Sequence, residues 1–246
     1  MLADVLVALA VMFAAVLQSV TGFGFALVAA PALVAAHGAQ ASVSLIAVLG
    51  PLVCLLALTT EGRRPAVDVD AAWALGLWAL PGLAAGVLLL DRLPERGIKA
   101  AVGLVVLAAV ALRQRDLRGP ATPDRVTPRD GRTIATGLAS GALTTTVGIN
   151  GPPLVLRLLR AGAPALVARD TLAALFVGLG AVALVSLAIG GLLDLPASTP
   201  TLALAAVAGQ VAGRPLLARL HPEQHQALVT ALLVLAGIGA LASALN

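Results

Sequence analysis

Residues 144–153 read TTTVGINGPP, and residues 19–24 read SVTGFG. Both stretches are rich in glycine and hydroxyl-bearing residues, and each lies inside a strongly apolar region of the chain. They separate short apolar segments, at 2–17 and 25–36 and at 133–145 and 153–161. A membrane core about 30 Å thick needs about 20 helical residues, so none of these segments is expected to cross it alone. We therefore predict that each pair forms a re-entrant helical hairpin or a broken helix.

The composition agrees with a membrane location. Of the 246 residues, 59% are apolar and 11% are charged, and the mean hydropathy is +1.00. Soluble domains carry about a quarter charged residues, so these values predict an all-α polytopic membrane protein. The formal net charge of +4 is assigned to loops that orient the chain in the bilayer. Membrane lipid is thus an expected partner, and nucleic acid is not, because the basic residues are not interleaved with aromatic ones.

The cysteine and histidine content argues against metal or cofactor chemistry. Cys54 is the only cysteine, which excludes a disulfide or a thiolate metal cluster within one chain. It lies in an apolar run, and we expect a small buried packing residue there. His37, His221 and His225 fall in expected loops, with no carboxylate or cysteine at a matching spacing. We expect neither a metal nor a cofactor.

The chain contains an internal repeat. A shift of 127 positions superposes Gly24 on Gly151, and it aligns GLAAGVLLLDRL at 82–93 with GQVAGRPLLARL at 209–220, with seven identities in twelve. We predict a first transmembrane repeat over 1–112, an Arg-rich linker over 113–132 and a second repeat over 133–246. Each repeat would hold one hairpin followed by three transmembrane helices.

The basic residues predict how the repeats are oriented. With three full crossings per half, 13 basic residues fall on one face and 3 on the other. The basic loops are 61–66, 113–132, 157–170 and 214–225. The positive-inside rule then places these loops in the cytosol of a bacterium and both termini in the periplasm, across the inner membrane. An odd number of crossings makes the two repeats inverted relative to each other.

Inverted repeats that each contain a glycine-interrupted segment are the sequence sign of a secondary transporter. A broken helix presents free N–H groups and a partial positive charge at its inner N-terminus, which suits an anion. Pro152 and Pro153 suit the first turn of a new helix because they lack an N–H donor. The two breaks are expected to meet near the membrane midplane and to form an alternating-access site for a small anion, with a proton as the possible coupling ion.

The candidate substrate-binding residues are the glycines of the two breaks, the polar residues beside them and one arginine. They are Gln18, Ser19, Thr21, Gly22, Gly24, Thr145, Thr146, Gly148, Asn150, Gly151 and Arg157. The hydroxyl and amide groups have an alternative role, which is to satisfy backbone groups freed by the interruption. Arg157 could attract anions or could simply snorkel to the cytosolic interface.

Several further residues have more than one possible role. The G-x-x-x-G pairs Gly82/Gly86 and Gly209/Gly213 favour close helix packing over ligand binding. The repeat partners Ser44 and Thr171 could be helix caps or functional groups. Asp170 could pair with an arginine, carry a proton or stand exposed at a helix start.

Two other function classes are alternatives to a transporter. An intramembrane enzyme, such as a lipid-phosphate hydrolase, needs paired acids, a Ser–His arrangement or H-E-x-x-H within the bilayer, and the chain has none of these. We therefore expect no enzyme activity. A non-transporting scaffold or assembly factor remains an alternative, but it leaves the two matched breaks unexplained.

The stretches QSVTGFGFALVAAPAL at 18–33 and SGALTTTVGINGPPLVLRLL at 140–159 resemble the paired signatures of the TauE/SafE family of membrane transporters. The resemblance covers essentially the whole chain. It implies transport of a small sulfur oxyanion or organosulfonate across the bacterial inner membrane. One departure is Phe25, where members of the family commonly carry a further glycine, and this difference could narrow or reshape the site.

Overall fold

The computed structural model describes residues 2–116 and 125–217, and over these residues it is helical with no strand. Its helices are α1 Leu2–Thr21, α2 Phe25–His37, α3 Ala39–Thr59, α4 Val69–Arg92, α5 Glu95–Asp116, α6 Gly131–Thr146, α7 Gly151–Arg160, α8 Ala165–Ile189 and α9 Thr199–Leu217. The predicted all-α class is confirmed. The apolar segment expected over 224–245 lies outside the described residues.

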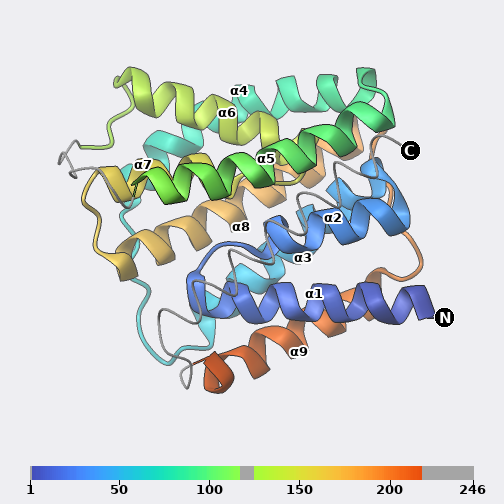
Figure 1. The fold of residues 1–246 in the computed structure, drawn as a ribbon. Coiled ribbons are helices and arrows are strands. Elements are labelled where there is room, and N and C mark those ends of the chain that lie inside the picture. Colours follow the sequence, from blue (N-terminus) through green and yellow to red (C-terminus); the bar gives the residue numbers. More distant parts are fainter. Residues whose placement is uncertain (1, 117–124, 218–246) are drawn as a thin grey trace.

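The helices run side by side in a bundle (Figure 1). Three helix pairs pack most extensively: α4 with α6, α1 with α9, and α3 with α8. In Figure 1, the α4/α6 pair lies on one side and the α1/α9 pair on the opposite side, with α3 and α8 between them. The long-range packing therefore joins the two halves of the chain throughout the bundle.

The shift of 127 positions also relates the helices. It brings the starts of α1, α2, α3 and α4 to within three residues of the starts of α6, α7, α8 and α9. Under this relation the α1/α9 and α4/α6 pairs are equivalent, because each joins the first helix of one half to the fourth helix of the other. The α3/α8 pair joins two equivalent helices. This pattern is the one that the expected internal repeat would produce, and the repeat itself stays a prediction.

The G-x-x-x-G pairs lie at the two equivalent interfaces. A Cβ atom at Gly82 would overlap the carbonyl oxygen of Leu138 on α6, and one at Gly209 would overlap the carbonyl oxygen of Met12 on α1. A Cβ at Gly86 or at Gly213 would also collide with the partner helix. The packing interpretation of these glycines is confirmed, since only a hydrogen atom allows the backbones to approach this closely.

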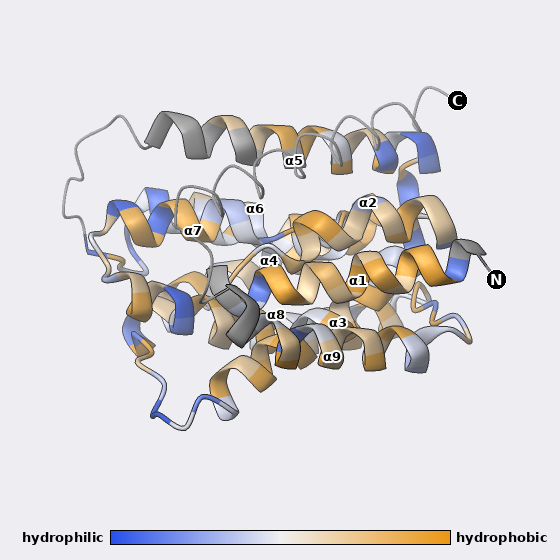
Figure 2. Cartoon of the chain, turned by 60° about the horizontal axis from the view of Figure 1, so that its bottom comes forward, coloured by the Kyte–Doolittle hydropathy of each residue, from blue (hydrophilic) through white to orange (hydrophobic). Residues whose placement is uncertain are grey.

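Three helices in the described part of the chain, α3, α4 and α8, are long and apolar enough to cross a membrane. Hydrophilic residues gather toward the two ends of the bundle, and the sides of the helices between them are hydrophobic (Figure 2). Large side chains such as Trp73 and Ile189, 68% and 83% exposed, lie on the outer surface. Their exposure fits contact with lipid. The further crossings expected over 97–112 and 194–217, which fall largely in α5 and α9, remain predictions.

The first hairpin differs from the expectation in the length of α1. The helix continues beyond the apolar segment 2–17 through the polar residues that follow it and ends at Thr21, for a total of 20 residues. At 1.5 Å per residue it is about 30 Å long. A count of apolar residues alone underestimates the length of α1, because polar residues continue the helix beyond the apolar segment.

Candidate functional site

Both predicted breaks are present, and both are shorter than expected. Residues 22–24 separate α1 from α2, and residues 147–150 separate α6 from α7. The helices extend into the two glycine-rich stretches. Ser19 still belongs to α1, and Pro152 already belongs to α7, where its missing N–H donor is harmless in the first turn.

Glycine is required at the corner of each break. Gly22 has φ +74° and Gly148 has φ +76°, which is the left-handed region that favours glycine. A Cβ atom at Gly22 would also overlap the side-chain stem of Arg169, and one at Gly148 would lie 2.8 Å from Cδ1 of Ile46. The two breaks therefore turn by the same means and against a packed neighbour.

The repeat partners Gly24 and Gly151 are less alike. Gly24 has φ +120°, whereas Gly151 is not among the glycines with positive φ. A Cβ atom at Gly151 would meet Cζ of Phe176 at 3.7 Å, which is an ordinary contact. The backbone conformation therefore favours glycine at Gly24 and does not require it at Gly151.

The two breaks line one cavity of about 40 Å³. One enclosed water needs about 10–15 Å³ by this measure, so the cavity has room for about three waters. Five of the predicted site residues line it: Gln18, Gly24, Gly148, Asn150 and Gly151. The other lining residues come from the breaks and from α2, α3, α6 and α8, and most are apolar. No charged side chain is among the lining residues. The prediction that the two breaks approach each other is confirmed.

Gln18 holds the first break together. Its side chain is 2% exposed, and Nε2 donates to the carbonyl of Gly22 at 2.9 Å and to Sγ of Cys54 at 3.3 Å. Oε1 accepts from the backbone N–H of Phe25 at 3.1 Å. The amide thus satisfies the end of α1 and the start of α2 at once, which is the structural role weighed for it above.

Asn150 is placed differently, at the second break. It occupies the N-cap position of α7, but its side chain does not cap that helix. Its carbonyl accepts from Oγ of Ser140 at 3.0 Å, and the two prolines that follow remove N–H donors from the first turn. Asn150 is the polar residue of the second break that lines the cavity.

Other predicted site residues serve helix packing and do not line the cavity. Oγ of Ser19 donates to the carbonyl of Val16 at 2.7 Å. Oγ1 of Thr145 donates to the carbonyl of Leu83 at 2.7 Å, and Oγ1 of Thr146 donates to the carbonyl of Gly86 at 3.1 Å. These last two bonds tie α6 to α4. Gly22 supports the break without lining the cavity, and the side chain of Thr21 lies outside the described part of the chain.

Arg157 lies away from the cavity. It is 5% exposed, and Nη2 donates to Oδ2 of Asp130 at 2.9 Å and to the carbonyl of Arg125 at 3.1 Å. Asp130 in turn caps α6 by accepting from the backbone N–H groups of Arg132 and Thr133. Burial raises the pKa of Asp130, but hydrogen bonds from Thr133, Arg132 and Arg157 outweigh it and hold that pKa below its usual value. Arg157 thus joins α7 to the cap of α6.

Asp170 is paired with an arginine. Its side chain is 4% exposed, and Arg63 contacts both of its carboxylate oxygens, at 2.6 and 2.8 Å. The backbone N–H of Ala66 also donates to Oδ2 at 2.7 Å. The interpretation of Asp170 as an exposed carboxylate is wrong, and its arginine-pairing alternative is confirmed.

Ser44 and Thr171 make equivalent contacts in the two halves. Oγ1 of Thr171 accepts from the backbone N–H of Asp68 at 2.9 Å, and Oγ of Ser44 accepts from that of Asp194 at 3.0 Å. Asp68 is the N-cap of α4, and Asp194 precedes α9. Neither hydroxyl caps its own helix. Each fixes the segment that leads into a helix of the other half.

Sequence reasoning did not identify the apolar wall of the cavity. Phe25, Ile46, Pro51 and Phe176 line it, and so does Cys54, which is 1% exposed. The burial expected for Cys54 is confirmed, although its place at the cavity was not foreseen. Apolar residues in an apolar chain carry no positional signal, so only the tertiary structure reveals this wall.

Comparison with known proteins assigns the family. The family described as sulfite exporter TauE/SafE matches residues 7–240. The chain belongs to this family. The resemblance seen at the two breaks is thereby confirmed, and membership in a family of exporters agrees with the expectation that the chain is not an enzyme. It also agrees with the multi-pass membrane character of the apolar helices.

One curated relative is the probable sulfite/organosulfonate exporter TauE of Cupriavidus necator. It is 29% identical over 147 residues, which cover 58% of this chain and 56% of the relative. The match thus spans little more than half the length of the relative. No solved structure matches the chain.

Proposed function

We propose that the protein is a secondary transporter that moves a small sulfur oxyanion or organosulfonate by alternating access at the cavity between the two breaks. The family and the name of the relative support an anion exporter. The observation that carries the proposal is that Gly24 and Asn150, from breaks in different halves, line the same cavity. A scaffold would not need two matched helix breaks around one cavity.

The arrangement of the hairpins supports the proposed inverted repeat. In Figure 1, the α1/α2 hairpin begins and ends toward the end of the bundle where the N-terminus lies, and the α6/α7 hairpin begins and ends toward the opposite end. Two hairpins that enter from opposite membrane faces and meet inside would place a binding site near the membrane midplane, as in inverted-repeat transporters.

The lining of the cavity favours a singly charged anion. Its polar groups are neutral, as in Gln18, Thr144 and Asn150, and no charged side chain lines it. Transferring a second negative charge into such a site is costly without a countercharge. Hydrogensulfite and short alkanesulfonates carry one charge, and sulfate carries two.

The basic loops support one orientation of the protein in the bacterial inner membrane. In this orientation the 61–66 and 113–132 segments lie in the cytosol and both termini lie in the periplasm. A fluorescent protein inserted in 117–124 should fluoresce. This orientation would be contradicted if the fluorescent protein inserted there did not fluoresce while alkaline phosphatase inserted at the same site was active.

Flux into proteoliposomes tests the function. Purified protein should accelerate uptake of radiolabelled sulfite over empty liposomes, and methanesulfonate should compete while sulfate does not. An imposed pH gradient should alter the rate if a proton is the coupling ion. Equal flux with and without protein would favour a scaffold role, and equal competition by sulfate would contradict the preference for one charge.

A further inference from the structure

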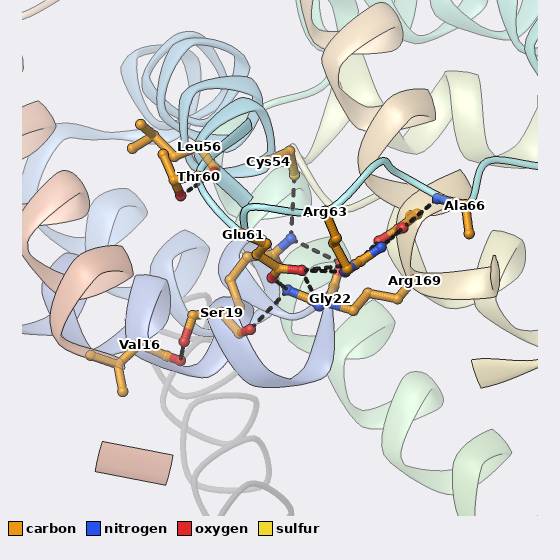
Figure 3. A network of polar contacts seen from close by, with 12 residues as sticks. Val16, Ser19, Gly22, Cys54, Leu56, Thr60, Glu61, Arg63, Ala66 and Arg169 are labelled. Atoms are coloured by element: carbon orange, nitrogen blue, oxygen red, sulfur yellow. Dashed lines mark hydrogen bonds and ion pairs between the residues drawn. The ribbon is translucent and has the colours of Figure 1, made fainter. Parts of the chain in front are cut away.

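Four charged side chains form an ion-pair cluster at one end of the bundle: Glu61 and Arg63 in the segment between α3 and α4, and Arg169 and Asp170 near the start of α8. Figure 3 shows Glu61, Arg63 and Arg169 of this cluster. Arg63 contacts Glu61 at 2.7 Å and Asp170 at 2.6 Å. Arg169 contacts both carboxylate oxygens of Glu61, one of them at 3.1 Å from Nη1. The side chains of Glu61 and Arg169 are 16% and 19% exposed, so this pair is largely shielded from water.

The cluster is connected directly to the first break. Nη2 of Arg169 donates to the carbonyl of Ser19 at 3.1 Å, and the stem of Arg169 packs against Gly22. The carbonyl of Gly22 accepts from Gln18, which lines the cavity. Gly22 therefore connects Arg169 of the cluster to Gln18 at the cavity.

The other half of the chain has no equivalent of this cluster. The shift of 127 positions takes Glu61 to Ala188, Arg63 to Gly190, Arg169 to Ser42 and Asp170 to Val43. The related contacts of Ser44 and Thr171 are present in both halves, so it is the four charged residues that have no charged counterparts. The equivalent positions in the other half therefore lack all four charges.

We propose that the Glu61–Arg169–Arg63–Asp170 cluster is an ionic gate that closes the cavity toward the end of the bundle formed by the 61–66 segment. This inference rests on the proposed transport function, because a gate has meaning only for a cavity that opens. Arg169 holds the backbone of the first break while Glu61 holds Arg169, so opening at this end separates the pair. Opening at the opposite end breaks none of these ion pairs.

The only cysteine of the chain provides the test, because Cys54 lines the cavity. The rate at which a membrane-impermeant thiol reagent modifies Cys54 is measured separately from each face of oriented membrane vesicles. Glu61→Gln removes the negative charge that pairs with Arg169 and should raise the rate about tenfold from the face carrying the 61–66 segment. The rate from the other face should stay the same or fall.

Matched variants make the result decisive. Glu95→Gln removes the exposed carboxylate that pairs with Lys99 at the start of α5 and should leave both rates unchanged. Arg63→Gln keeps the Arg169–Glu61 pair and should give a smaller increase on the same face, which provides a second test if Glu61→Gln does not fold. An unchanged rate, or an equal rise from both faces, in a folded variant would overturn the gate. The measurement needs no substrate, so its failure is distinguishable from a failure of transport.

Discussion

Nε2 of Gln18 donates to the carbonyl oxygen of Gly22 at 2.9 Å, so a side chain that lines the cavity also fixes the end of α1. The same amide accepts from the N–H of Phe25 at the start of α2. The Gln18 side chain therefore links the two helix ends that flank the first break. The second break keeps its Asn150 side chain out of the cap of α7.

This difference predicts that Gln18 and Asn150 respond differently to substitution. Gln18→Leu keeps the approximate size but leaves buried backbone groups unsatisfied, so it should lower the free energy of unfolding by about 1–3 kcal/mol. Asn150→Leu should change stability little and abolish anion binding. Thermal unfolding in detergent and equilibrium binding of methanesulfonate separate the two effects. Equal destabilisation by both variants would contradict these roles.

The two breaks predict which glycines tolerate alanine. Gly148→Ala places a side chain at positive φ, which costs about 1–2 kcal/mol, and also presses on Ile46. Gly151→Ala meets only an ordinary contact with Phe176 and should keep the stability of the wild type. Denaturation of the two purified variants provides the measurement. A Gly151→Ala variant as unstable as Gly148→Ala would refute this reading of the second break.

The pKa values of Glu61 and Asp130 predict an acid-sensitive stability. Burial raises the pKa of Glu61, but hydrogen bonds from Arg169 and Arg63 outweigh it and hold that pKa below its usual 4.5. Asp130 is likewise held below 3.8. A carboxyl group whose pKa is lowered on folding stabilises the folded state above its unfolded pKa and loses that contribution as pH falls.

The melting temperature of the wild type should therefore be steady near neutral pH and fall below about pH 4.5, the usual Glu value. Glu61→Gln should melt lower at neutral pH and show a shallower decline in acid. Melting curves across the pH range in one detergent provide the comparison. An identical acid slope in the two proteins would show that Glu61 contributes nothing to this dependence.

The local features of the fold could be predicted from the sequence, whereas the long-range partners could not. Gly22, Gly148 and Pro152 mark the breaks because backbone geometry demands particular residues there. Arg63 and Asp170 lie 107 positions apart, and no local pattern reports their pairing. Arg157 was predicted from its position next to a break, but its helix carries it to Asp130 instead.

The cavity between the breaks is tested most directly by protecting Cys54 with substrate. Cys54 lines the cavity, so an anion bound there should block the approach of a thiol reagent. Methanesulfonate should slow the modification of Cys54 in a saturable manner, with a half-maximal concentration equal to that for inhibition of sulfite flux, and methylammonium should have no effect. A protein whose flux is inhibited by methanesulfonate while Cys54 reacts at an unchanged rate would place the anion site elsewhere.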